Sequence, residues 1–191
     1  MTFEDGLREV LDELGVETSA PQFDRLCGHF RLLERWNKRI NLTRISDPAE
    51  AARRHYGESA HLHRELPDAA SFVDVGSGAG FPGLPIATLR PSSSITLVES
   101  IRKKAAFLRE ATRDMPNVRV CDCRIRQWTG SAEWALLRAV NPLGVLGDLA
   151  GKARRVAVLG TDRPPDGPFT DWESRPTPWS RQRKLWLGAS R

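Results

Sequence analysis

Residues 71–83, SFVDVGSGAGFPG, decide how the rest of the chain is arranged. Their apolar beginning is typical of a buried strand, which stops abruptly at Gly76. Gly76, Gly78 and Gly80 allow backbone angles that other residues resist, and they let a ligand come close to the main chain. A helix expected from residue 83 turns its free N–H groups toward this glycine turn. A strand, a glycine turn and a helix start together predict a nucleotide-type cofactor site.

Two fingerprints overlap in this turn. The pattern D-x-G-x-G-x-G, from Asp74 to Gly80, is typical of S-adenosylmethionine (SAM) methyltransferases. The pattern G-x-G-x-x-G, from Gly78 to Gly83, formally matches the dinucleotide fingerprint, but it begins two residues too late for a turn that leaves the strand. SAM has an ammonium group and no pyrophosphate, so the carboxylate of Asp74 at the strand end favours SAM. A purely structural turn with capping acids is the alternative.

The chain beyond residue 70 alternates between strand and helix patterns, which predicts a doubly wound, mostly parallel sheet with its ligand at the strand carboxyl ends. Glu99 ends the second strand, at the right distance to accept hydrogen bonds from ribose hydroxyls. The region 161–181 is expected to be a loop around a short strand at 170–174. The expected parallel strands are 72–75, 95–99, 118–121, 134–138 and 155–159, the helices 83–90, 102–113 and 142–152, and the antiparallel last strand 184–188.

The first 66 residues are expected to form a helical extension. Apolar residues recur at helical spacing from Phe3 to Leu14, and Gly15 follows as a helix-ending residue. A second helix is predicted from Ser19 through Trp36, and a third from residue 48 to about residue 63. We therefore divide the chain into a helical extension, residues 1–66, and a cofactor-binding domain, residues 67–191.

The net charge of +5 is unevenly distributed. Residues 1–66 carry a net charge of −2 and residues 67–191 one of +7. A basic cofactor domain fits a polyanionic substrate, although charges that only keep the protein in solution would look the same. The three cysteines have no framework spacing and no apolar run approaches the length of a membrane span, so we expect a cytoplasmic protein without a membrane segment.

Several motifs together resemble the RsmG family, also called GidB, of bacterial 16S rRNA (guanine-N7) methyltransferases. WNK at 36–38 followed by NLT at 41–43 is similar to the family's N-terminal signature. HYGES at 55–59 is similar to its His-x-x-Asp-Ser motif, with Glu58 in place of Asp. Residues 74–85, DVGSGAGFPGLP, are close to its SAM loop, and Glu99-Ser100 with Lys103 and Lys104 continues the match. The resemblance covers roughly residues 5–160.

The resemblance implies a Rossmann-like class I SAM-dependent methyltransferase that transfers a methyl group from SAM to N7 of a guanine in 16S rRNA, leaving S-adenosyl-L-homocysteine. The substrate is either naked 16S rRNA or the 30S particle. Guanine N7 already exposes a lone pair, so its methylation needs positioning and exclusion of water rather than a general base. We expect a monomer. We also expect no metal, since His61 and His63 are two residues apart and would diverge on a helix.

The site residues follow from the turn and from the resemblance. Arg138, Asn41 and His55 are the expected catalytic residues: Arg138 would hold a phosphate or the guanine edge, and the other two would close the pocket from the helical part. An ion pair of Arg138 with Asp122 or Glu99 is the alternative. The expected cofactor-binding residues are Asp74, Gly76, Ser77, Gly78, Gly80, Phe81, Glu99, Ser100, Ile125, Arg126 and Arg138, with Ile125 covering an adenine face and Arg126 turned away or at the purine edge.

The sequence also departs from the family pattern. Arg126 stands where an acid is expected, and Leu159 where the family has a lysine. These changes leave open a diverged protein that binds SAM and RNA with weak or no methyl transfer. A small-molecule methyltransferase is a further alternative, and an NAD oxidoreductase a distant one. The basic groups expected to form an RNA face are 102–104, 124 and 126, 154–155, and 181, 183 and 184, with Trp36, Trp128 and Trp179 as candidates for base stacking.

Overall fold

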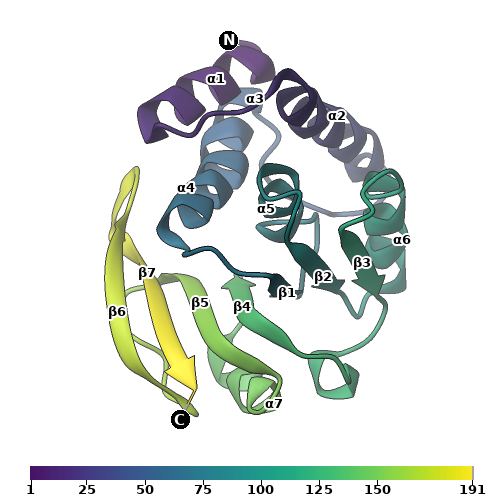
Figure 1. Cartoon of the computed structure of the whole chain (residues 1–191). Helices are drawn as coiled ribbons and strands as arrows, with labels where there is room; N and C mark the ends of the chain where they lie inside the picture. The colour runs from purple at the N-terminus through teal and green to yellow at the C-terminus, as the bar shows by residue number, and fades with distance from the viewer. Residues whose placement is uncertain (191) are drawn as a thin grey trace.

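One mixed sheet of seven strands organises the part of the chain that is described (Figure 1). The computed structural model describes residues 1–190, without the side chains of Thr161 and Arg181. The strand order is β3-β2-β1-β4-β5-β7-β6. The strands are β1 Ser71–Val75, β2 Ser94–Val98, β3 Val118–Cys121, β4 Ala132–Arg138, β5 Ala153–Thr161, β6 Phe169–Thr177 and β7 Ser180–Ser190.

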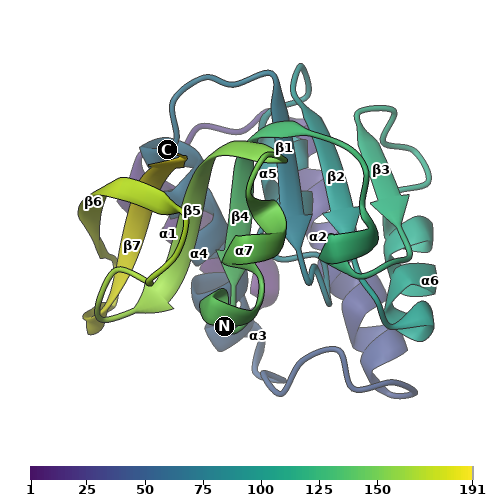
Figure 2. The ribbon, with the colours of Figure 1, turned by 90° about the horizontal axis from the view of Figure 1, so that it is seen from below.

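The first five strands are parallel, and β7 runs antiparallel to both of its neighbours, which confirms the predicted Rossmann-like arrangement. β1 pairs with β2 on one side and with β4 on the other, so the strand order reverses beside β1. In open sheets of this kind ligands bind outside the strand carboxyl ends at such a reversal. β7 inserts antiparallel between β5 and β6. Figure 2, seen from below, shows β1, β2 and β3 running in the same direction.

Helices cover both faces of the sheet, most of them on one. α1 begins at a capping box between Thr2 and Asp5 and ends at Gly15 with φ 63°, as predicted. The helical segments are α1 Phe3–Leu14, α2 Ala20–Asn37, α3 Pro48–Ala51, the π-helical turn η1 Ala52–Gly57, α4 Glu58–Glu65, α5 Gly83–Leu89, α6 Arg102–Ala111, the 3₁₀ turns η2 Ile125–Gln127 and η3 Pro142–Gly144, and α7 Leu146–Leu149.

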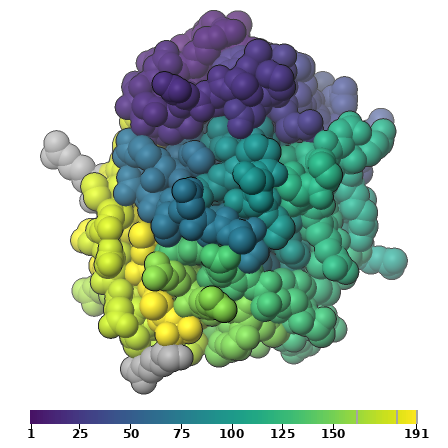
Figure 3. All heavy atoms as spheres, in the orientation of Figure 1, coloured from purple at the N-terminus to yellow at the C-terminus, as the bar shows by residue number. Residues whose placement is uncertain are grey.

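One buried apolar cluster joins the N-terminal helices to the sheet. It extends from Leu7 of α1 through Leu33 of α2 and Tyr56 of η1 to Phe107 of α6 and Leu136 of β4. Figure 3 shows the N-terminal residues as a continuous layer across the top of the molecule. A second cluster, with Leu149 of α7, covers the opposite face. The division into residues 1–66 and 67–191 stays a prediction, and the two parts share a core.

One predicted helix is wrong and one predicted strand is too short. The single helix expected at 142–152 is instead the short turns η3 and α7, because Gly144 and Gly147 disfavour a helix and Gly151 adopts φ 74°. The short strand expected at 170–174 is present but longer than predicted, since β6 takes up nine residues of the region expected to be mostly loop. β6 is an edge strand with polar residues and Pro176, so its pattern lacks the apolar alternation of an inner strand.

Gly57 lies where α1, η1 and the tip of the β6–β7 hairpin meet. A Cβ at this position would lie 2.6 Å from Val10 Cγ1 and 2.8 Å from two ring atoms of Trp179. We predict that Gly57→Ala lowers the free energy of unfolding by about 1–3 kcal/mol because it overpacks this contact. Urea denaturation measures the change.

Gly28 in α2 provides the matched control. A Cβ at Gly28 would meet no atom within 4 Å. Gly28→Ala should therefore stabilise the protein by about 0.5–1 kcal/mol through helix propensity. Equal unfolding free energies for Gly57→Ala and Gly28→Ala would contradict the proposed crowding at Gly57.

Candidate active site

The glycine turn after β1 is fixed by backbone hydrogen bonds to the neighbouring strand. The N–H groups of Gly76 and Ser77 donate to the Val98 carbonyl at 2.8 and 3.2 Å, and Ser77 Oγ donates to the Asp74 carbonyl at 3.0 Å. A Cβ at Gly76, where φ is 71°, would lie 2.7 Å from Val140 Cγ1. The backbone therefore runs close to the β4 loop at a place where only glycine fits.

Glu99 ties this turn to the start of α6. Its carboxylate is 5% exposed. One oxygen accepts from the Gly78 N–H at 2.9 Å and the other from the Ile101 N–H at 2.8 Å. Each carboxylate oxygen can accept a further hydrogen bond. Glu99 can therefore hold the turn and still accept from the hydroxyls of a ribose, the role that the sequence predicts.

Asp74 lies beneath the turn with one of its oxygens unpaired. Its side chain is 1% exposed, and Oδ2 accepts from the Gly83 N–H at 3.1 Å. Oδ1 is buried and has no hydrogen-bond partner among the described residues. Burial raises the pKa of this carboxyl from 3.8 to about 7. A buried carboxylate oxygen without a donor fits the ammonium group of SAM, which would supply one.

A cleft of about 370 Å³ opens at the carboxyl ends of β1 and β2. Four predicted cofactor residues, Gly76, Ser100, Ile125 and Arg126, line it. Its apolar walls suit the flat adenine ring of SAM. The sequence did not indicate Asp148 of α7, a carboxylate at this cleft. The other lining residues are Val75, Val98, Cys123, Arg124, Val140, Gly144, Val145 and Asp148.

His55 joins the N-terminal signature to the cofactor turn. Its ring stacks on Phe81, with the centroids 4.5 Å apart. Arg138 Nη2 donates to His55 Nδ1 at 3.2 Å, so the ring hydrogen is on Nε2, which donates to Thr43 Oγ1 at 2.8 Å. Burial, and then the nearby Arg138 charge, lower the pKa of His55 to about 3. The histidine is therefore neutral at physiological pH and positions its neighbours.

Arg138, at the end of β4, forms an ion pair with Glu58. Nε and Nη2 each lie 2.9 Å from Glu58 Oε2, and Nη2 also donates to the Arg54 carbonyl at 2.8 Å. Glu58 accepts a second hydrogen bond from Arg183 of β7. The alternative expectation named Asp122 or Glu99 as partner and is wrong in both cases, because Glu58 occupies the guanidinium. Nη1 of Arg138 makes no hydrogen bond to any described residue and can donate to a ligand.

Asn37 fixes the loop that carries Asn41. Asn37 Oδ1 accepts from the N–H groups of Leu42 and Thr43 at 2.8 and 3.0 Å, and Nδ2 donates to the Thr43 carbonyl at 3.0 Å. Asn41 is exposed, and its side chain makes no hydrogen bond within residues 1–190. Its catalytic role stays a prediction.

His29 was missed in the sequence. It is 3% exposed; Nε2 donates to the Ala79 carbonyl of the cofactor turn at 3.0 Å, so Nδ1 accepts from the Tyr56 hydroxyl at 2.9 Å. Burial lowers its pKa to about 4. Its place among Leu26, Phe30 and Leu33, on the apolar face of α2, was the signal that would have found it.

Of the other sequence candidates, Gly80 belongs to the glycine turn, whereas Trp128 and Trp179 lie outside the site. Gly80 donates its N–H to the Ser77 carbonyl at 2.6 Å and completes the turn. Trp128 is buried in the second core cluster, and Trp179 donates Nε1 to Glu13 Oε2 at 3.0 Å. The side chain of Arg181 lies outside the described residues. Among those described, no group of three or more metal-ligating side chains comes together and no helix has the length and apolarity to cross a membrane.

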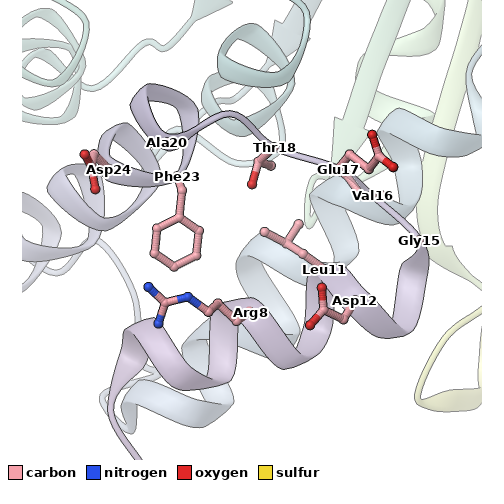
Figure 4. A pocket seen from close by; sticks show the side chains of 10 residues that line it. All are labelled: Arg8, Leu11, Asp12, Gly15, Val16, Glu17, Thr18, Ala20, Phe23 and Asp24. Carbon is pink, nitrogen blue, oxygen red and sulfur yellow. The ribbon is translucent and has the colours of Figure 1, made fainter.

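A second hollow, of about 750 Å³, lies between α1 and α2 and contains none of the predicted site residues. Figure 4 shows Arg8 and Phe23 facing each other in it, with the guanidinium 4.7 Å from the ring centroid. Asp12, Glu17 and Asp24 are also at its rim. Its mixed charges and its distance along the fold from the glycine turn separate it from the cofactor chemistry.

Comparison with known proteins identifies the family. The model of the GidB family, described as rRNA small subunit methyltransferase G, matches residues 22–156. The chain belongs to this family. The matched residues include the His55 motif, the glycine turn, Glu99 and Arg138, which the structure brings to one edge of the sheet.

Curated members of the GidB family resemble most of the chain. The ribosomal RNA small subunit methyltransferase G of Clostridium beijerinckii is 33% identical over 183 residues, covering 91% of this chain and 76% of that protein. The protein of the same name from Halorhodospira halophila is 40% identical over 146 residues, covering 73% and 68%. That from Neisseria meningitidis is 32% identical over 190 residues, covering 82% and 92%.

Solved structures support the fold of this GidB family member. The mitomycin 7-O-methyltransferase MmcR has a TM-score of 0.63 at 13% identity, over 89% of this chain and 67% of that one. The magnesium protoporphyrin IX methyltransferase of Synechocystis, solved with bound SAH, has a TM-score of 0.56 at 13% identity, over 85% and 94%. Both likenesses concern the α/β methyltransferase fold.

We predict that His29→Phe weakens SAM binding, because it keeps an aromatic ring but leaves the Ala79 carbonyl and the Tyr56 hydroxyl unpaired. Each buried unpaired group should also cost about 1–3 kcal/mol of folding free energy. Calorimetric titration with SAM and thermal unfolding measure the two effects.

Tyr56→Phe is the matched control, since it removes one hydroxyl and keeps the bond from His29 to Ala79. It should weaken SAM binding less than His29→Phe does. An equal loss in both variants would show that the contact with Ala79 does not position the turn.

We predict that Asp74→Asn stabilises the unliganded protein at high pH. The raised pKa means that the proton on Asp74 favours the fold below about pH 3.8 and that this contribution is lost as the pH rises through about 7. Asparagine does not ionise, so its advantage should be small near pH 4 and reach at most about 4 kcal/mol near pH 8. Urea denaturation at both pH values measures it.

The same Asp74→Asn variant should bind SAM more weakly near pH 8, because the carboxylate charge that pairs with the ammonium group is gone. Calorimetry measures the affinity. A variant with unchanged affinity would remove Asp74 from the cofactor site.

Proposed function

We propose that this chain transfers the methyl group of SAM to N7 of a guanine in small-subunit rRNA. Membership of the family of rRNA small subunit methyltransferases supports SAM-dependent methylation of that RNA. The observation that carries the proposal is the meeting of the family's N-terminal motif with the cofactor turn, in which His55 stacks on Phe81 and binds Arg138. These contacts link the helical part to the site where the methyl group is delivered.

The choice of N7 is supported by the protonation state of the site. SAM, when bound, supplies an activated methyl group on a positively charged sulfur. His55 is neutral, and both of its ring nitrogens are engaged by Thr43 and Arg138, so it cannot serve as a free general base. Guanine N7 needs no base, because its lone pair is available without loss of a proton. The remaining requirement is orientation, which Arg138 Nη1 can provide by donating to the guanine edge.

We assign the cofactor to the residues around the glycine turn. Asp74 would bind the ammonium group and Glu99 the ribose, while Ile125 covers the adenine ring. Arg126 is exposed at the rim of the cleft, where it can turn away from the purine or contact its edge. The full set is Asp74, Gly76, Ser77, Gly78, Gly80, Phe81, Glu99, Ser100, Ile125, Arg126 and Arg138, with Arg138, His55 and Asn41 as the catalytic group.

Leu159 fills the position at which the family has a lysine. Leu159 is 4% exposed in β5, in register with Arg138 of β4. It contributes to the core on the face that packs against the N-terminal helices. We propose that methyl transfer proceeds without a lysine there, in the cytoplasm, by a monomer that needs no metal. The cysteines described are all free, which fits a reducing compartment.

The test is transfer of labelled methyl groups from SAM to 30S particles and to naked 16S rRNA from a strain that lacks this modification. We predict label in the RNA, and strand scission at the labelled guanine after borohydride and aniline treatment, which requires methylation at N7. Arg138→Lys should reduce the rate on the order of 100-fold, because lysine cannot bind Glu58 and a guanine edge together.

The control for Arg138→Lys is Arg25→Lys, the same exchange at an exposed position of α2 outside the cleft, which should leave the rate within about threefold. Calorimetry with SAM shows whether each variant keeps its cofactor site. Label without scission would contradict N7. No label despite SAM binding would instead support the diverged binding protein, which Arg126 and Leu159 motivate.

A further inference from the structure

A groove of about 870 Å³ runs between the end of α2 and the length of α6, from Lys103 to Glu110. Trp36 fixes one wall, since its Nε1 donates to Glu110 Oε2 at 3.1 Å and its ring meets Phe107 edge to face at 5.8 Å. Figures 1 and 2 both show α2 and α6 side by side. The lining residues are Arg35, Trp36, Lys38, Arg39, Ile40, Lys103, Ala106 and Glu110.

The groove gathers positive charge that the protein does not neutralise. Its four cations, Arg35, Lys38, Arg39 and Lys103, are exposed, and none forms an ion pair with a described residue. By contrast, Arg109 on the next turns of α6 pairs with Asp122 at 3.5 Å. Glu110, the carboxylate in the lining, is engaged by the Trp36 indole. Four cations against one carboxylate give the lining a net charge of +3.

Helix stability does not explain this charge. The macrodipole favours cations at a helix end, which accounts for Arg35 in the last turn of α2. It disfavours them at a helix start, yet the first turn of α6 holds three cations, at 102–104, and no acidic residue. A bound anion would offset that cost, so the placement of Lys103 indicates a negatively charged partner.

Both walls of the groove continue into the active site. α6 begins directly after Ile101, whose N–H is held by Glu99 Oε1 of the cofactor site. The other wall leads through Asn37 to Thr43, which is bonded to His55. A chain lying in the groove would therefore extend toward the place where the methyl group is transferred.

We propose that this groove binds a single-stranded segment of the substrate RNA next to the methylated nucleotide, with its phosphates on the four cations. The half-buried Trp36 and Ile40 offer an apolar surface to a ribose or base. The proposal rests on the proposed function for the identity of the RNA. The proposal excludes the basic group at 154–155 from the RNA site. Arg155 stacks on Trp134 near the amino end of β5, and the active site lies at the opposite edge of the sheet.

The test is binding of a fluorescein-labelled single-stranded oligoribonucleotide at several salt concentrations. The variant Arg39→Gln/Lys103→Gln removes two charges from the groove. Each phosphate contact contributes about 0.7 to the slope of log affinity against log salt, so the slope should fall by about 1.4. The control Arg25→Gln/Arg119→Gln removes two exposed, unpaired charges outside the groove and outside the basic groups named above, and it should keep the wild-type slope. Calorimetry should give wild-type SAM affinity for both.

Equal slopes for the groove variant and the control would overturn the proposal. So would displacement of the RNA by polyglutamate at equal charge concentration, which would point to an acidic protein. Trp36→Phe should keep the fold and lose part of the tryptophan fluorescence quenching that RNA causes. The test separates this proposal from the proposed function. If the wild-type protein methylates the RNA and the groove variant binds RNA with the wild-type salt slope, only the groove proposal is refuted. If RNA binding depends on the groove but no methyl group is transferred, only the proposed function is refuted.

Discussion

The buried carboxylate of Glu58 is the contact on which the relative placement of three parts of the chain depends. It accepts from Arg138 of the parallel strands, from Arg183 of the antiparallel pair, and itself begins α4 of the helical part. Removing ions from water costs several kcal/mol, and a pair of guanidiniums on one carboxylate offsets that cost only while all three are present. The network then positions His55 against Phe81, and so couples the helical part to the cofactor turn.

Much of the sheet and the turn at the candidate cofactor site were predictable because local chemistry fixes them. The glycine turn, the position of Asp74 and Glu99 at strand ends, and the alternation of parallel strands with helices follow from residue types at fixed spacing. Contacts between distant segments were not predictable. The ion pair of Glu58 and Arg138 joins residues 80 positions apart, and the hydrogen bond of His29 to Ala79 joins residues 50 positions apart. The full length of β6 was not predictable for a related reason: only residues 170–174 were expected as a strand, and the rest of β6 forms by pairing with β7.

The net charge of a long segment can conceal a local cluster of like charges on the surface. Residues 1–66 are slightly acidic in total, which directed attention to the cofactor domain as the basic half. The fold sorts those charges. Acids gather around the hollow of Figure 4, whereas Arg35, Lys38 and Arg39 meet Lys103 across the groove. Net charge per segment is therefore a weak guide to a surface when a helix presents different faces to different partners.

The orientation of α4 depends on the number of residues in the π-helical turn at 52–57 more than on which residues they are. A π turn holds one more residue than an α turn, and here the Ser59 hydroxyl donates to the His55 carbonyl at 2.7 Å. Loss of a single residue would give a regular helix and rotate everything after it by about 100°. Glu58 would then lose its ion pairs with Arg138 and Arg183, although the helix itself would be more regular. The π-helical turn thus determines the rotation of α4 about its axis, and with it whether Glu58 faces the arginines of the sheet.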